Sequence, residues 1–177
     1  FKLKGDKAEK PEMYLGGSIK EAETPNGTKC WTLSSKKYVE SAVANVAAKL
    51  AKQNLKLPSK CETPTKPGYK PDEDTSQELN TEGLKYYQEL IGVLRWAIEL
   101  GRVDILLEVS LLSSHLALPR TGHLEQVYHI FGYLNKYPRK RIFFDPDYPA
   151  IGEDRFVKHD WYDFYRDAKE DLSLIHI

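Results

Sequence analysis

The sequence predicts an α+β fold that is mainly α: an N-terminal β-hairpin plus a helix, then a three-helix bundle and a short strand. Three observations support this class. An Asn-Gly pair lies between two short runs of β type. In later stretches, apolar residues recur at spacings of three and four, which is typical of helices. The last three of these helical stretches are connected to one another by only a few residues. Short connections make sequential helices antiparallel neighbours, so these helices are expected to bury their apolar faces against one another.

The hairpin is expected within residues 12–33. Residues 13–19 and 29–33 are short runs of β type, and Asn26-Gly27 lies in the segment that separates them. An Asn-Gly pair between two such runs is the strongest short-range signal for a hairpin. The N-terminal part of the chain is therefore expected to begin with two antiparallel strands.

A helix is expected to follow the hairpin, from about residue 36 to residue 52. Ser34 or Ser35 is in position to cap it. Lys36 and Lys37 lie off its apolar face. A basic helix face is usually only solvated, so phosphate contact by these two lysines stands beside a purely structural interpretation. The apolar face comprises Tyr38, Val39, Ala42, Val43, Val46, Ala47 and Leu50.

Three further helices are expected between residues 84 and 136. Gly101 follows the first at the position of a left-handed cap, and Asp104 can cap the second. Pro119 stops the second helix, and Thr121 can cap the third. The expected apolar faces are Tyr87, Leu90, Ile91, Leu94, Ala97 and Ile98; Leu107, Leu111 and Leu112; and Leu124, Val127, Tyr128, Phe131 and Leu134.

The chain is expected to divide into two structural units. Residues 1–56 hold the hairpin and its helix, whereas residues 81–145 hold the helical bundle and a short strand at 142–144. The segment between them, residues 57–80, has no apolar period and contains four prolines. A loop of this length inside a compact domain is uncommon, so we interpret it as a linker that packs along the surface through Tyr69.

Both ends of the chain look unnatural. The chain begins at Phe1 without Met, and an acidic tail rich in aromatic residues, 146–171, is followed by the apolar residues 172–177. These last six residues match an in-frame translation of a sequencing-library adaptor, and we expect them to be an artefact. An ordinary C-terminus is the alternative. We therefore expect a fragment that is truncated at both ends.

The net charge is zero but unevenly distributed, with +6 in residues 1–60 and −5 in residues 143–177. A basic first third suits contact with phosphates, so any nucleic-acid surface is expected to be local. The only two cysteines, Cys30 and Cys61, have no metal-ligand spacing and favour a reducing, intracellular compartment. No run of about 18 apolar residues occurs, so no membrane partner is expected.

No catalytic or metal site is expected. Two-metal phosphoryl transfer needs carboxylates that hold two divalent ions about 4 Å apart, and the sequence has no adjacent Asp-Asp pair. His115, His123 and His129 are separated by eight and six residues. These spacings do not place two histidines on one helical face, as a spacing of three or four would.

The helical region carries a family resemblance. The motifs Tyr-x-x-Leu-Ile-Gly-x-Leu-Arg-Trp, Gly-Arg-x-Asp-Ile, Val-Ser-x-Leu-Ser and Tyr-Leu begin at Tyr87, Gly101, Val109 and Tyr133. Their order and spacing, over about a third of the chain, resemble the reverse transcriptase of copia-type retrotransposons. That family usually has proline at the position of Val103, whereas the capping residue Asp104 is kept.

The resemblance implies a piece of the Pol polyprotein of such an element. Residues 1–56 would correspond to the end of the polymerase palm and residues 81–145 to the thumb, a non-catalytic part that grips an RNA/DNA template-primer duplex. The palm and ribonuclease H domains would be its other partners, in a cytoplasmic virus-like particle. The catalytic carboxylates would lie upstream of Phe1, so Mg²⁺ is expected for the parent polymerase, whereas this fragment needs no cofactor and is expected to be inactive alone.

A non-enzymatic helical module that binds a protein partner is the alternative function. Under the polymerase interpretation, the run Tyr14-Leu15-Gly16 would support the primer end. The N-terminus of the third bundle helix, at residues 120–123, would offer N–H groups to phosphate. This helix start is equally an ordinary stop-and-cap sequence, with Arg120 pointing to water. The expected nucleic-acid contacts are Tyr14, Leu15, Gly16, Lys36, Lys37, Arg120, Thr121, Gly122, His123, Arg139, Lys140 and Arg141.

Overall fold

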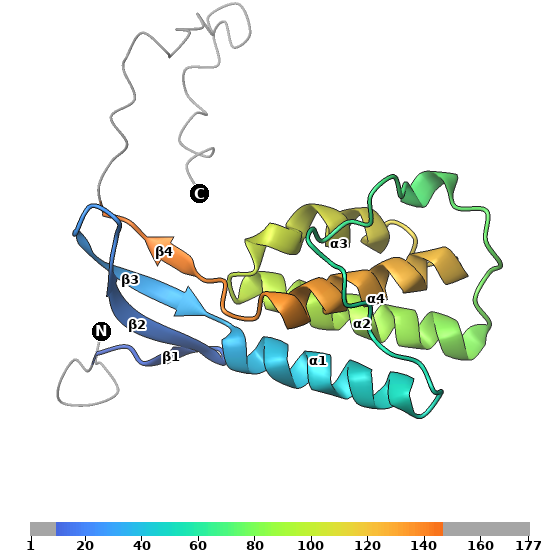
Figure 1. The fold of residues 1–177 in the computed structure, drawn as a ribbon, viewed down its shortest axis with the longest axis horizontal. Helices are drawn as coiled ribbons and strands as arrows, with labels where there is room; N and C mark the ends of the chain where they lie inside the picture. Colours follow the sequence, from blue (N-terminus) through green and yellow to red (C-terminus); the bar gives the residue numbers. More distant parts are fainter. Residues whose placement is uncertain (1–9, 147–177) are drawn as a thin grey trace, which may run out of the picture. The chain divides into compact units, whose positions relative to one another are not determined.

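The computed structural model describes residues 10–146 and confirms the α+β, mainly helical class (Figure 1). The strands are β1 (Met13–Tyr14), β2 (Gly17–Glu23), β3 (Lys29–Ser34) and β4 (Ile142–Phe144). The α-helices are α1 (Lys36–Ala51), α2 (Thr81–Glu99), α3 (Leu106–Ser113) and α4 (Thr121–Lys136), and η1 (Pro71–Glu73) and η2 (Val103–Ile105) are short 3-10 helices. The predicted order of hairpin, helix, three helices and strand is confirmed.

Strands β2 and β3 form the predicted hairpin, with Ser18 opposite Ser34. The first predicted run, residues 13–19, is not one strand. Leu15 and Gly16 have φ angles of 48° and 95°, in the left-handed region that ends an extended strand. The run therefore splits at these two residues into β1 and β2, which pair with each other.

Strand β4 returns to the hairpin and pairs antiparallel with β3, which gives the sheet order β1-β2-β3-β4. Phe143 lies opposite Thr32, and Ile142 lies opposite Leu33. Ile142 also packs against the end of α2, since a Cβ added to Gly101 would lie 3.3 Å from the Ile142 Cδ1 atom. Gly101 itself has a φ of +102°, as expected for the predicted left-handed cap.

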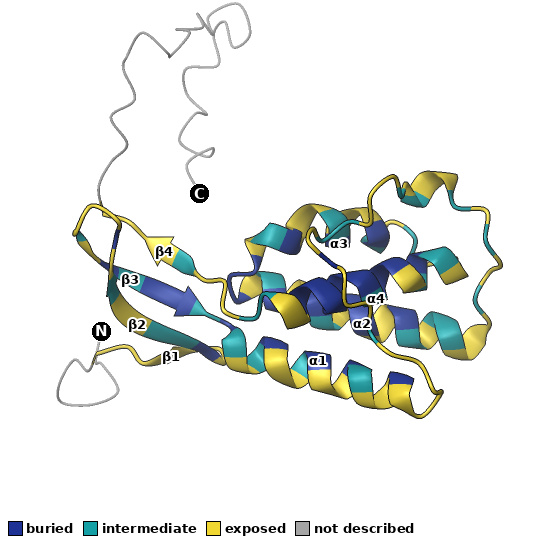
Figure 2. Ribbon diagram, viewed as in Figure 1, coloured by how far each residue is buried: buried dark blue, intermediate teal, exposed yellow. Residues whose placement is uncertain are grey.

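The four α-helices share one apolar core, so the helix of the first expected unit packs on the bundle of the second (Figure 2). The prediction for α3 is partly wrong. Leu107 and Leu111 are 65% and 46% exposed, whereas Ile105, Val109 and Leu112 are buried. Ile105, Val109 and Leu112 are spaced four and three residues apart, so they form one helical face, and that face is the one that packs inward.

Residues 57–80, which we call the strap, lie along α4 and not only against the surface at Tyr69. Cys61 in the strap is fully buried. A Cβ on Gly132 of α4 would lie 2.4 Å from the Pro58 carbonyl oxygen, so only glycine lets the strap approach this closely. The Gln126 side chain donates to the Pro64 carbonyl at 2.9 Å. The segment predicted as a linker is thus hydrogen-bonded to the bundle.

The described residues 10–146 belong to one compact unit. The expectations for residues 147–171 and for the six C-terminal residues 172–177 lie outside the described part of the chain. None of the described helices is long and apolar enough to cross a membrane.

Candidate nucleic-acid interface

Four of the residues expected to bind nucleic acid line one hollow of about 420 Å³, which we call the basic groove. Lys36 and Lys37 come from the first turn of α1, and Arg139 and Arg141 come from the segment between α4 and β4. Lys20 of β2 adds a fifth cation that sequence reasoning missed. The groove is lined by Ser18, Lys20, Thr32, Ser34, Lys36, Lys37, Glu40, Arg139 and Arg141.

The floor of the basic groove is one face of the β2–β3 hairpin. Alternate residues of a strand point to the same face, and the register sets Ser18 beside Ser34 and Lys20 beside Thr32. The Thr32 hydroxyl donates to the Lys20 carbonyl at 3.1 Å, and the Ser18 hydroxyl donates to the Ser34 carbonyl at 3.3 Å. Cross-strand hydrogen bonds thus hold this polar floor.

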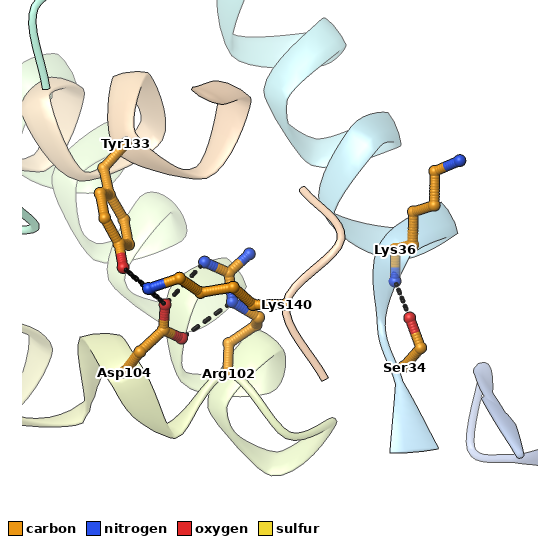
Figure 3. Close-up of polar contacts among 6 residues, drawn as sticks. All are labelled: Ser34, Lys36, Arg102, Asp104, Tyr133 and Lys140. Atoms are coloured by element: carbon orange, nitrogen blue, oxygen red, sulfur yellow. Dashed lines mark hydrogen bonds and ion pairs between the residues drawn. The ribbon is translucent and has the colours of Figure 1, made fainter. Parts of the chain in front are cut away.

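The first turn of α1 forms one wall of the basic groove. The Lys36 backbone N–H donates to the Ser34 hydroxyl at 3.4 Å and so connects the helix to the floor (Figure 3). The Lys36 ammonium lies 3.6 Å from the Glu40 carboxylate. Five cations and this one carboxylate line the groove, a formal balance of +4. The positive end of the helix dipole adds to that charge, so the groove favours anions.

Arg139 and Arg141 form the opposite wall, and an aromatic ring lies beside Arg141. The Arg141 guanidinium lies 4.8 Å from the centroid of the Phe143 ring, and Phe143 is 42% exposed. Because Phe143 pairs with Thr32, it lies on the sheet face that carries Lys20 and Thr32. An exposed aromatic ring among cations suits a nucleic acid, whose bases stack and whose phosphates are anionic.

Tyr14 ends β1, and Leu15 and Gly16 form the turn to β2, immediately before the groove floor. The Tyr14 and Leu15 side chains are 55% and 59% exposed. None of the three lines the basic groove, although the next residues of the chain lead to Ser18 at its edge. They are accessible, but the structure does not bring them together with the lysines and arginines.

The N-terminus of α4 is occupied by the strap. Arg120 donates to the Ser76 carbonyl at 2.6 Å and pairs with Glu78, and the Gly122 N–H donates to the Ser76 hydroxyl at 2.8 Å. The Thr121 hydroxyl donates to a strap carbonyl as well, at 3.0 Å. These contacts use the groups that a phosphate would need, so they favour the stop-and-cap interpretation of this segment.

His123 completes the cap of α4. Its Nδ1 atom accepts from the Arg120 backbone N–H at 3.0 Å, so its proton is on Nε2, which donates to the Pro71 carbonyl at 3.0 Å. By the same logic His129 Nε2 donates to the Thr63 carbonyl, and its Nδ1 atom lies 3.5 Å from Cys61 Sγ. Both histidines therefore fasten the strap, a role that their spacing in the sequence did not indicate.

Cys61 lies beside His129, but its thiol is fully buried and is not activated. Burial raises the pKa of the Cys61 thiol, which opposes formation of the thiolate. Both Cys61 and Cys30 are buried and carry free thiols. Among the described residues, no cluster of three or more His, Cys, Asp or Glu side chains could hold a metal ion.

Lys140 differs from its two arginine neighbours, because its half-exposed side chain is paired with groups of the helical bundle. It donates to the Tyr133 hydroxyl at 2.5 Å and lies 3.5 Å from the Asp104 carboxylate (Figure 3). Lys140 does not line the basic groove, whereas Arg139 and Arg141 do. All three residues of the run line a second hollow together with Asp104, so the two arginines reach both hollows, whereas Lys140 does not reach the basic groove.

Comparison with known proteins gives no assignment: no family model, no curated protein and no solved structure matches this chain.

Proposed function

We propose that this chain binds a nucleic-acid duplex in the basic groove, as the non-catalytic, template-primer-gripping part of a retrotransposon reverse transcriptase. One observation carries the proposal. Two segments that are about a hundred residues apart in sequence, Lys36-Lys37 and Arg139–Arg141, supply cations to the same hollow. Both were expected from the sequence to contact phosphate, and their convergence supports that expectation.

The chemistry of the groove suits a phosphate backbone better than base edges. Arginine and lysine side chains, hydroxyl groups and a helix N-terminus are the groups that contact phosphate oxygens in protein–nucleic acid complexes. Such contacts position a duplex without reading its sequence. The groove therefore fits a protein that must hold any template and primer.

The proposal assigns no bond-making or bond-breaking step to the described residues. In the parent polymerase, the paired carboxylates and their Mg²⁺ ions would belong to other parts of the Pol polyprotein. The partners would be the RNA/DNA duplex and the palm and ribonuclease H domains, in the cytoplasmic particle of the element. The role of this chain would be to hold the duplex in place.

Binding of the full chain to an RNA/DNA primer-template at several salt concentrations tests the proposal. Each phosphate contact releases counterions and contributes roughly −0.9 to the slope of log K against log salt. Three or four contacts from the groove would give a slope of roughly −3 to −4. Binding that is absent, or that does not depend on salt, would rule out the proposed function.

One observation favours the alternative, a helical module that binds a protein partner. Val103, Leu107 and Leu111 are spaced four residues apart and are 57%, 65% and 46% exposed on η2 and α3. Exposed apolar stripes of this kind mark protein interaction sites. A partner would need a matching apolar surface, and Leu107→Asp would weaken its binding without changing duplex binding.

A further inference from the structure

Asp104 connects three elements beside the basic groove. It lies in η2 and accepts two hydrogen bonds from Arg102, at 2.8 and 2.9 Å. Its Oδ2 atom also accepts from the hydroxyl of Tyr133, on α4, at 2.9 Å, and lies 3.5 Å from the Lys140 ammonium, just before β4. Figure 3 shows these side chains converging on the carboxylate. Asp104 therefore ties η2, α4 and the segment that leads into β4.

The Lys140 ammonium is held by more than one contact. It donates to the Tyr133 hydroxyl and lies 5.0 Å from the centroid of the Tyr133 ring and 5.3 Å from that of the Tyr137 ring. The hydrogen bond to Tyr133 raises the pKa of Lys140, although burial acts against it. The charge of Lys140, whose side chain is half-exposed, is thus balanced by Asp104 and flanked by two aromatic rings.

This arrangement determines what the neighbouring arginines can do. Lys140 points to the Asp104 side of its segment, and Arg139 and Arg141, on either side of it in the chain, line the basic groove. Ile142 then packs against the turn at Gly101. Lys140 and Ile142, two residues apart, therefore fix the segment to η2 and the end of α2, while Arg139 and Arg141 stay available to the groove.

We propose that Lys140 is a positioning residue: its ammonium binds Asp104 and Tyr133 and thereby holds Arg139 and Arg141 in the orientation in which they contact phosphate. This inference rests on the proposed function of the groove. It assigns the three basic residues of the Arg-Lys-Arg run to two roles, although their charges are alike.

The salt dependence of duplex binding separates the two roles. Lys140→Met removes the ammonium but keeps a long side chain, and Arg141→Met is the matched variant with the same loss of charge. Arg141→Met should reduce the slope of log K against log salt by roughly 0.9, because a phosphate contact is lost. Lys140→Met should keep the slope and weaken binding about threefold to tenfold at every salt concentration, because the arginines must be ordered on binding. Lys140→Arg, which keeps the cation, should restore the affinity.

Amide hydrogen exchange of the free protein gives a second measurement. Lys140→Met and Tyr133→Phe should both speed exchange in β4, whereas Lys37→Met, which removes a groove charge elsewhere, should not. A slope reduced by Lys140→Met as much as by Arg141→Met would overturn the inference, and so would unchanged exchange in β4. If the wild-type chain bound no duplex, the proposed function would fail, and the exchange result would still decide whether Lys140 holds β4.

Discussion

The Arg141 guanidinium stacks over the Phe143 ring, with 4.8 Å between its central carbon and the ring centroid. The ring and the cation lie on the sheet face that forms the floor of the basic groove. Phe143 therefore orients a cation and offers an apolar surface beside it.

Phe143→Ala is expected to weaken duplex binding about twofold to fivefold, which corresponds to a cation–π contact at an exposed site. The slope of log K against log salt should stay the same, because no charge is removed. Titration of a labelled duplex at three salt concentrations measures both quantities. A reduced slope would mean that Arg141 loses its phosphate contact altogether.

Asp104→Ala is expected to destabilise the fold by roughly 3–5 kcal/mol, because it leaves the fully buried Arg102 without its counterion. Burial raises the pKa of the Asp104 carboxyl, but Arg102, Tyr133 and Lys140 lower it by more. Urea unfolding measures the change. The double variant Arg102→Met, Asp104→Leu should recover much of the stability, and equal losses in the single and double variants would contradict this account.

Gly132→Ala and Gly92→Ala are expected to change stability in opposite directions. At Gly132 a Cβ would lie 2.4 Å from the Pro58 carbonyl oxygen and 2.8 Å from Cys61 Sγ, so the strap must shift, at a cost of about 1–3 kcal/mol. Gly92 is an exposed position of α2, and nothing lies within 4 Å of the added carbon. Alanine there should stabilise the helix by up to about 1 kcal/mol. Thermal unfolding of both variants tests this; destabilisation by both would argue against close packing of the strap.

The Asp74 carboxylate makes the stability of the strap depend on pH. Burial raises its pKa, but hydrogen bonds from Ser76 and Tyr69 lower the pKa by more than burial raises it. The net result is a pKa of about 2 instead of an ordinary 3.8. A carboxyl with a lowered pKa in the folded state stabilises the protein above its ordinary pKa, and this stabilisation is lost as the pH falls toward 2. Asp74→Asn should therefore destabilise the protein at pH 7, and the difference from wild type should shrink between pH 4 and pH 2. A difference that is constant over this range would exclude the carboxylate as its cause.

The local elements of the fold could be predicted because their signals are local. Asn26-Gly27 indicated the hairpin turn, and the apolar spacing of Val39, Val43 and Val46 indicated α1. The exposure of Leu107 was not predictable in this way. The sets Leu107, Leu111, Leu112 and Ile105, Val109, Leu112 both have helical spacing, so the choice between the two faces depends on how α3 packs against the other helices.

The basic groove could be predicted only in part. Lys36 and Arg139 were recognisable as charges beside a helix and a strand, but their proximity depends on the pairing of β4 with β3, which joins distant parts of the chain. Lys20 faces the groove through the pairing of β2 with β3, and the pairing of β4 with β3 places Phe143 on the same sheet face. The attachment of the strap by His123 and His129 was also missed, because polar residues on a helix usually face water and only the fold reveals carbonyl partners.

The most direct test of the central claim compares two double variants of equal charge. Lys37→Glu with Arg141→Glu reverses two charges in the basic groove, whereas Lys60→Glu with Lys85→Glu reverses two exposed charges outside it. Binding of the full chain to an RNA/DNA primer-template is measured from low to moderate salt. The account predicts that the groove variant loses roughly two units of salt slope and most of its affinity, while the control stays close to wild type. Equal losses in the two variants would show that binding follows net charge, and would contradict a site in the groove.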